Sequence, residues 1–70
     1  MMPLPFAEIG EDYLIQRIGG TPEVKKHLET LGFVVGGVVS VVNSLNGNLI
    51  VKVKESRIAL DGRMAEKIMI

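Results

Sequence analysis

The sequence predicts a mainly β domain with one or two short helices, folded as a small, partly open antiparallel barrel. Three observations support this fold class. Short β-prone segments separated by turn residues recur along the chain. Only one stretch has the spacing of an amphipathic helix. The 70 residues suffice for one domain with a thin core, so we treat 1–70 as a single unit. Closing a sheet removes exposed edges, which is why several short strands favour a barrel.

The amino-terminal segment is expected to be extended and then to form the first strand. Pro3 and Pro5 lack an amide N–H and restrict the residue before them, which disfavours a helix here. Phe6 and Ile9 are the first expected core anchors. Residues 13–18 (YLIQRI) are β-prone, but their apolar side chains do not alternate cleanly, so we expect a strand with a bulge as an option.

One helix is predicted between two glycine-containing breaks. Thr21 has a side chain that suits the N-cap, and Pro22 suits the first helical position. Gly32 is expected to end the helix in a left-handed conformation. Such a short helix is not stable alone, so its apolar stripe should pack on the sheet. That stripe consists of Val24, Leu28 and Leu31.

The glycine pair Gly36 and Gly37 should turn the chain into its most strand-like run, Val38–Val42. This strand is apolar on both faces except at Ser40, as expected if one face meets the core and the other meets the helix or a partner. Residues 43–48 (NSLNGN) contain an Asn-Gly turn signal. The six residues between the strands predict a connection looser than a two-residue hairpin.

The carboxyl-terminal part predicts two more strands, a helical turn and a last strand. Residues 49–54 alternate well, with Leu49, Val51 and Val53 facing one way. Ile50 is the odd apolar residue on the polar side. After this strand we expect a turn at Glu55 and Ser56, a strand at 57–60, a helical turn at 64–67 capped by Asp61, and a strand at 68–70, with Ile58, Leu60, Ile68 and Ile70 inside.

Composition limits the classes of partner. Eight Lys and Arg balance eight Asp and Glu, and the pI of about 6.6 provides no long-range field toward nucleic acid or anionic lipid. No apolar run approaches the roughly 20 residues of a membrane span, and the start lacks a signal-peptide pattern. The absence of Cys fits a reducing compartment. We therefore expect a cytoplasmic protein without direct membrane insertion.

His27 is the one histidine and lies four residues after Glu23, beside the apolar stripe. A histidine at such a place can act as a metal ligand or a proton switch. Two ligands are fewer than the three or four that transition-metal sites usually use. We therefore expect a surface histidine and assign no metal ligands.

Three other groups of residues could indicate a binding or catalytic site, but each fits a structural role better. The pair 19–20 (Gly-Gly) precedes a helix N-terminus but matches no phosphate-loop motif, so we expect a turn. Lys52, Lys54 and Arg57 lie close in sequence, yet no aromatic residue follows Phe33 to stack on bases, so we expect a solvated face and no nucleic-acid partner. The serines have no acid and histidine arrangement for a relay. An enzyme is not expected, and no catalytic or cofactor-binding residue is assigned.

Five apolar residues, Val34, Val35, Ile50, Met64 and Met69, occupy positions that the pattern does not place in the core. The mean hydropathy of +0.33 indicates more apolar surface than a thin core can hide. An exposed apolar patch on a small domain is typical of a binding face, and Met side chains adapt well at such surfaces. The predicted partner-binding residues are Val34, Val35, Ile50 and Met69.

Read in order, the segments LPFAEIGEDYLIQRIGG, HLETLGF, VVGGVVSVV, NGNLIVKV, RIAL and AEKIMI resemble the FeoA family of ferrous iron transport proteins. The resemblance covers nearly the whole chain. Its most specific part is L-x-x-L-G-F-x-x-G followed by a valine-rich strand. These positions are Leu28, Leu31, Gly32, Phe33 and Gly36.

The resemblance implies an SH3-like barrel with an inserted helix. It also implies a cytosolic accessory protein that binds the G-protein region of an FeoB-type ferrous iron transporter and modulates it. No catalytic residue or cofactor comes with the resemblance. The alternative is a module that binds or senses ferrous iron directly, through His27 and nearby carboxylates. Association into a homo-oligomer stays open.

Overall fold

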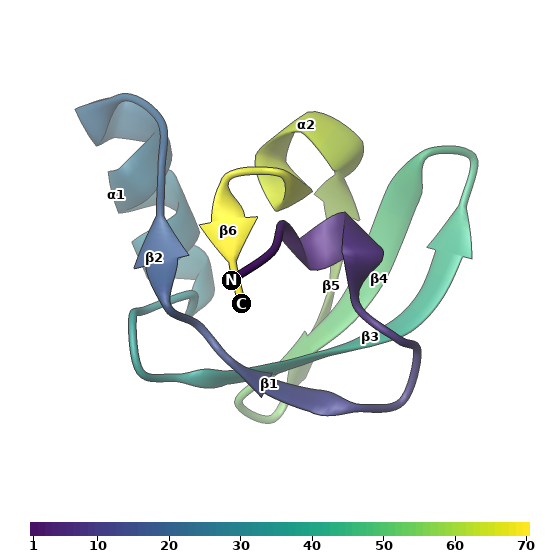
Figure 1. Cartoon of the computed structure of the whole chain (residues 1–70). Coiled ribbons are helices and arrows are strands. Elements are labelled where there is room, and N and C mark those ends of the chain that lie inside the picture. Colours follow the sequence, from purple (N-terminus) through teal and green to yellow (C-terminus); the bar gives the residue numbers. More distant parts are fainter.

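The computed structural model describes all 70 residues and contains six strands and two α-helices (Figure 1). All strand pairs are antiparallel. The predicted fold class is therefore confirmed. The elements are a 3-10 helix η1 (Leu4–Phe6), β1 (Asp12–Leu14), β2 (Arg17–Ile18), α1 (Pro22–Leu31), β3 (Val38–Leu45), β4 (Asn48–Val53), β5 (Ser56–Asp61), α2 (Gly62–Ala65) and β6 (Ile68–Met69).

The strands form two sheets that leave the barrel open. Four strands pair in the order β1-β3-β4-β5, and β2 pairs with β6. The strand predicted at residues 13–18 is split, because the chain leaves one sheet after Leu14 and enters the other at Arg17. At the far edge, β5 has only β4 as a neighbour.

The core lies between the inner face of the four-stranded sheet, α1 and the two ends of the chain. The alternation of β4 is confirmed, since its inward residues are buried while Lys52 is exposed. The last strand is also oriented as expected, with Ile68 and Ile70 buried. Thirteen buried apolar residues make up this core: Leu4, Ile15, Leu28, Phe33, Val39, Val41, Leu49, Val51, Val53, Leu60, Ala65, Ile68 and Ile70.

The expected amino-terminal anchors are wrong. Phe6 and Ile9 are 72% and 61% exposed, and Leu4 enters the core instead. The prolines do not keep this segment extended, because η1 needs no proline N–H: the amide of Phe6 donates to the carbonyl of Pro3 at 3.0 Å. The single turn directs Leu4 inward and Phe6 outward, which the spacing of apolar residues does not reveal.

Helix α1 begins and ends where the sequence predicts. The side chain of Thr21 accepts a hydrogen bond from the amide of Val24, at 3.3 Å. Gly32 is left-handed with φ of 109°, and its amide donates to the last carbonyls of the helix. Leu28 is fully buried, and Leu31 packs against the core. The predicted apolar stripe is therefore confirmed.

The β3–β4 connection is a two-residue hairpin turn, so the prediction of a looser loop is wrong. Strand β3 continues to Leu45, and Asn46 and Gly47 form the turn with φ of 50° and 80°. Positive φ at both positions is the turn geometry that matches the twist of the flanking strands. A register shift between Val41 and Asn43 accommodates the longer strand as a bulge.

The next turn also differs by one residue from the prediction. Lys54 and Glu55 form it, with φ of 56° at Lys54, and Ser56 already belongs to β5. The Asp61 cap is confirmed, because its side chain accepts from the amide of Arg63 at 2.7 Å. The helical turn starts directly after this cap and therefore earlier than expected.

The two ends of the chain lie side by side (Figure 1). The amide of Met2 donates to the carbonyl of Ile70 at 2.8 Å, and the amide of Ile70 donates back to Met2 at 2.8 Å. An isolated bridge between Pro3 and Met69 continues this pairing. The first and last segments therefore hold each other against the core.

Gly36→Val should destabilise the fold by about 1–2 kcal/mol, because Gly36 has φ of 87° and a side chain there is strained. Nothing lies within 4 Å of an added Cβ, so the cost comes from the backbone alone. Thermal unfolding followed by circular dichroism measures it. Gly36→Asn should lose less, since Asn tolerates this conformation. An unchanged melting temperature for Gly36→Val would contradict the turn.

Candidate partner-binding groove

The loop between α1 and β3 sends one apolar side chain into the core and leaves two outside. The amide of Phe33 donates to the carbonyl of Leu28 at 2.9 Å, and its ring is fully buried. The amide of Gly37 donates to the carbonyl of Val34 at 2.9 Å and closes a tight turn. This turn leaves Val34 37% exposed and Val35 64% exposed.

The same loop is fixed to the segment between β1 and β2. The amide of Ile15 donates to the carbonyl of Gly37, and the amide of Gly36 donates to the carbonyl of Ile15, both at 2.8 Å. Ile15 itself is buried. The exposed valines are therefore presented on a backbone that is already ordered, which lowers the entropy lost when a partner binds.

A groove of about 240 Å³ lies between this loop and α1. Its apolar part consists of core and loop residues, and α1 contributes one basic and one acidic side chain. Ligand and peptide grooves commonly combine an apolar surface with a few polar groups that orient the occupant. The lining residues are Ile18, Lys25, Glu29, Phe33, Val34 and Val35.

The structure brings together only part of the predicted partner surface. Val34 and Val35 line the groove. Ile50 lies on the outer side of β4, where Asn43 and Ala59 are its cross-strand neighbours. Met69 is half-buried on β6. Binding by any of these residues stays a prediction, and Ile50 and Met69 lie outside the groove.

Four of the six lining residues, Ile18, Lys25, Glu29 and Phe33, were missed by the sequence pattern. Phe33 has the character of a core residue, and Ile18 sits in a strand of unclear alternation. Both reach the groove because β2 and the end of α1 meet there, and this meeting is a tertiary feature. No local sequence signal identifies either residue as part of the groove, apart from the position of Phe33 before Val34 and of Ile18 before Gly19.

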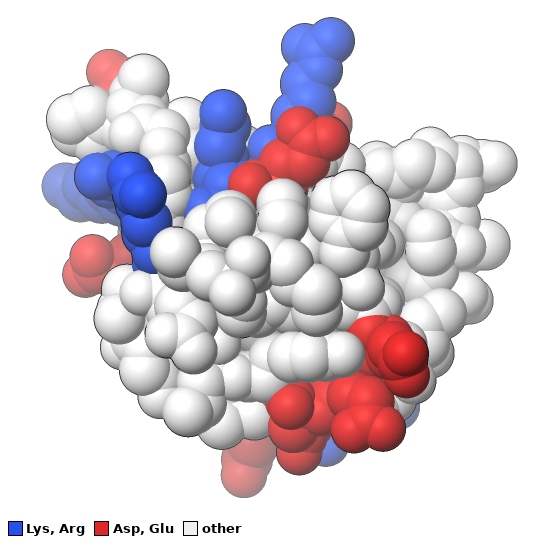
Figure 2. Space-filling model, in the orientation of Figure 1, with Lys and Arg blue, Asp and Glu red and all other residues white.

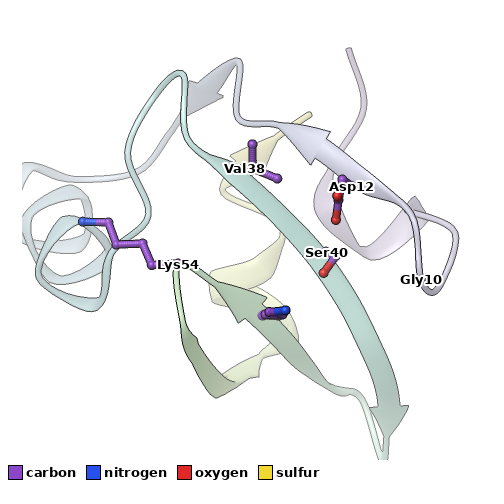
Figure 3. Close-up of a pocket in the computed structure, with 6 residues that line it drawn as sticks. Gly10, Asp12, Val38, Ser40 and Lys54 are labelled. Atoms are coloured by element: carbon purple, nitrogen blue, oxygen red, sulfur yellow. The ribbon is translucent and has the colours of Figure 1, made fainter.

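A second hollow, of about 470 Å³, lies on the outer face of the four-stranded sheet and is mostly polar (Figure 3). Ser40 lies at its floor, between its cross-strand neighbours Asp12 and Lys52. Lys54 extends away from Ser40. The residues that line the hollow are Gly10, Asp12, Val38, Ser40, Lys52 and Lys54.

The three cations considered for nucleic-acid binding do not form one cluster. Lys52 and Arg57 are directly opposite each other on β4 and β5. The side chain of Lys54 instead runs toward the end of α1, because its Cδ would lie 3.8 Å from a Cβ built on Gly32. The carboxylate of Asp12 lies in the same cross-strand row as Lys52.

Charge is distributed unevenly over the surface although the total is balanced. Figure 2 shows acidic side chains gathered over the segment that joins η1 to β1, whereas most basic side chains in this view lie on the side of α1 and α2. Glu8, Glu11 and Asp12 belong to the acidic segment.

His27 is exposed on α1, as predicted. No group of three or more His, Asp or Glu side chains in the structure is arranged to hold a metal ion. No helix has the length and apolar character needed to cross a bilayer.

These features define a class of protein, a small, partly open antiparallel barrel with a partly apolar groove beside its helix. The FeoA domain model matches residues 2–70. The chain belongs to the FeoA family, which is associated with ferrous iron transport. The resemblance seen in the sequence is thereby confirmed.

Known relatives agree with this assignment. A protein of Methanocaldococcus jannaschii that carries the name Fe(2+) transport protein A is 33% identical over 70 residues, which are 100% of this chain and 85% of the relative. Iron(II) transport protein A from Clostridium thermocellum is 26% identical with a TM-score of 0.90, over 97% of this chain and 43% of that chain.

The SH3-like fold is also confirmed. The structure of Stenotrophomonas maltophilia FeoA complexed with zinc is described as that of a prokaryotic SH3 domain protein. It is 23% identical to this chain with a TM-score of 0.84, over 99% of this chain and 88% of that one. At this identity the likeness supports the fold alone.

Proposed function

We propose that the chain is a non-enzymatic accessory protein of ferrous iron uptake, which acts in the cytoplasm, binds the G-protein region of an FeoB-type transporter and modulates it. Membership of the FeoA family over residues 2–70 supports the transport role. The S. maltophilia relative is itself proposed to be a ferrous iron transport activating factor. The proposal requires no bound cofactor.

The observation that carries the binding step is the groove beside Val34 and Val35. Val35 is 64% exposed although the domain has a thin core that would gain from burying it. Contiguous exposed apolar surface is typical of a recognition site, and Val34 and Val35 are adjacent on this ordered loop. Lys25 and Glu29 at the rim offer one cationic and one anionic contact to a partner segment that inserts an apolar side chain between them.

Val35→Asp should weaken binding to the purified cytosolic G-protein region at least about tenfold, because a charge would be buried against an apolar partner surface. Isothermal titration calorimetry measures this affinity directly. Val35 is exposed and is not among the residues that pack against the core, so the variant should stay folded, which circular dichroism verifies.

Leu45→Asp is the matched control. Leu45 is 54% exposed at the β3–β4 turn and undergoes the same change from an apolar to an acidic side chain. It should bind like the native chain. Absence of binding by the native chain would sink the proposed function, and equal losses for both variants would remove the groove from it.

A further inference from the structure

Strand β5 is an unprotected edge of the four-stranded sheet. It pairs with β4 alone. None of the backbone hydrogen bonds that join loops, turns and caps involves residues Ser56–Asp61. Free strand edges readily pair with another chain unless they are blocked.

The free backbone groups of this edge can be identified from the register. Val53 and Ser56 face each other across the two-residue turn and are therefore a hydrogen-bonded pair. Hydrogen-bonded pairs alternate along an antiparallel ladder. The amides and carbonyls of Arg57, Ala59 and Asp61 consequently point away from β4, and all three residues are exposed.

The chain that follows β5 does not cover the edge. A Cβ built on Gly62 would lie 2.5 Å from the carbonyl oxygen of Gly47, so α2 starts against the β3–β4 turn. Ala65, at the end of α2, is fully buried. The helix therefore turns back toward the core and leaves the outward side of β5 accessible.

We infer that β5 is the interface of a homodimer, in which the β5 strands of two copies pair antiparallel about a two-fold axis at Ala59. In this register Arg57 faces Asp61 of the second copy, and Asp61 faces Arg57 of the second copy. Each strand thus presents a cation, a small residue and an anion in an order that complements itself. Such self-complementarity is what a two-fold interface requires.

This pairing would offset an unfavourable contact between two like charges within the single chain. Arg57 is directly opposite Lys52 on β4, and like charges in that position are unfavourable. The carboxylate of the second copy would lie on the other side of Arg57. One oxygen of Asp61 accepts from the amide of Arg63, and its second oxygen is free to receive the guanidinium.

The pairing also accounts for Ile50, the apolar residue on the polar side of β4. Ile50 is the cross-strand neighbour of Ala59. In the dimer, Ala59 of one copy faces Ala59 of the other, and each is flanked by Ile50 of its own copy. These four side chains form an apolar row across the two-fold axis. The flanking rows are polar. An edge contact of this size is expected to give a weak, concentration-dependent dimer.

Sedimentation velocity of the full chain over a concentration series tests the inference, with a limiting mass of twice 7.6 kDa expected. Arg57→Glu replaces both attractive pairs by repulsive ones and should raise the dimer Kd roughly tenfold or more. Lys26→Glu makes the same charge change on exposed α1 and should leave the Kd unchanged.

Two further variants keep the test independent of folding. Asp61→Asn removes the charge but retains a good helix cap, and should weaken the dimer less than Arg57→Glu. Ala59→Pro removes the central outward amide, which an edge strand tolerates, and should abolish the dimer. Amide hydrogen exchange by NMR should show protection of residues 57, 59 and 61 only in concentrated samples.

A chain that is monomeric at every soluble concentration overturns the inference. So does a dimer that survives both Arg57→Glu and Ala59→Pro, or one whose concentration-dependent protection lies outside β5. Because the groove beside Val35 is not part of this edge, dimer formation and transporter binding succeed or fail separately.

Discussion

Phe33→Ala is expected to unfold most of the protein at room temperature. The ring of Phe33 is fully buried where the end of α1 meets the sheet, and truncation of such a residue costs about 3–5 kcal/mol. A single core in a domain of this length rarely supplies more than about 3–5 kcal/mol. The loss is therefore comparable to the whole stability, and urea unfolding followed by circular dichroism measures it.

Phe6→Ala is the matched control for this substitution. Phe6 is 72% exposed, so its removal should change the free energy of unfolding by less than about 0.5 kcal/mol. Equal urea midpoints for the two variants would contradict the position of Phe33 in the core. Because Phe33 also lines the groove, its loss should remove transporter binding together with the fold, whereas Val35→Asp should remove binding alone.

Gly62→Ala is expected to destabilise the domain by about 1–3 kcal/mol, the usual cost of overpacking. Replacing Gly by Ala in a helix normally gains about 0.5–1 kcal/mol. Here the new Cβ would lie 2.5 Å from the carbonyl oxygen of Gly47, a backbone atom that cannot move aside easily. The steric cost exceeds the gain in helix propensity, so the sign reverses.

The melting temperature measures this effect, with Gly19→Ala as the control. A Cβ on Gly19 would meet only the carbonyl of Lys67, at an ordinary 3.7 Å. Gly19→Ala should therefore change the melting temperature little. A Gly62→Ala protein that melts at or above the native temperature would show that α2 does not start against the β3–β4 turn.

The elements that could be predicted from the sequence are those specified by local chemistry. Thr21, Pro22 and Gly32 fix both ends of α1 through groups within a few residues of each other. The inward side of β4 follows from alternation alone. The prediction for the amino terminus was wrong because packing against α2 and the last strand, rather than proline content, determines that Leu4 is buried and Phe6 is exposed.

The groove was only half predictable for the same reason. Val34 and Val35 stand out in sequence because a helix stop and a glycine turn bracket them. Ile18 and Phe33 join them only when β2 and α1 have packed together. The length of β3 was misjudged because no local motif indicates the bulge near Val42, which lets the strand continue to Leu45.

The pairing of Met2 with Ile70 has a consequence for synthesis of the protein. Strand β6 and the residue after it provide Ile68 and Ile70 to the core, and β6 pairs with β2, near the opposite end of the chain. A growing chain therefore lacks part of its core until residue 70 has left the ribosome. Until then the amides of Gln16 and Gly19 lack their acceptors, the carbonyls of Met69 and Lys67, so the domain should complete its folding only after translation of this segment.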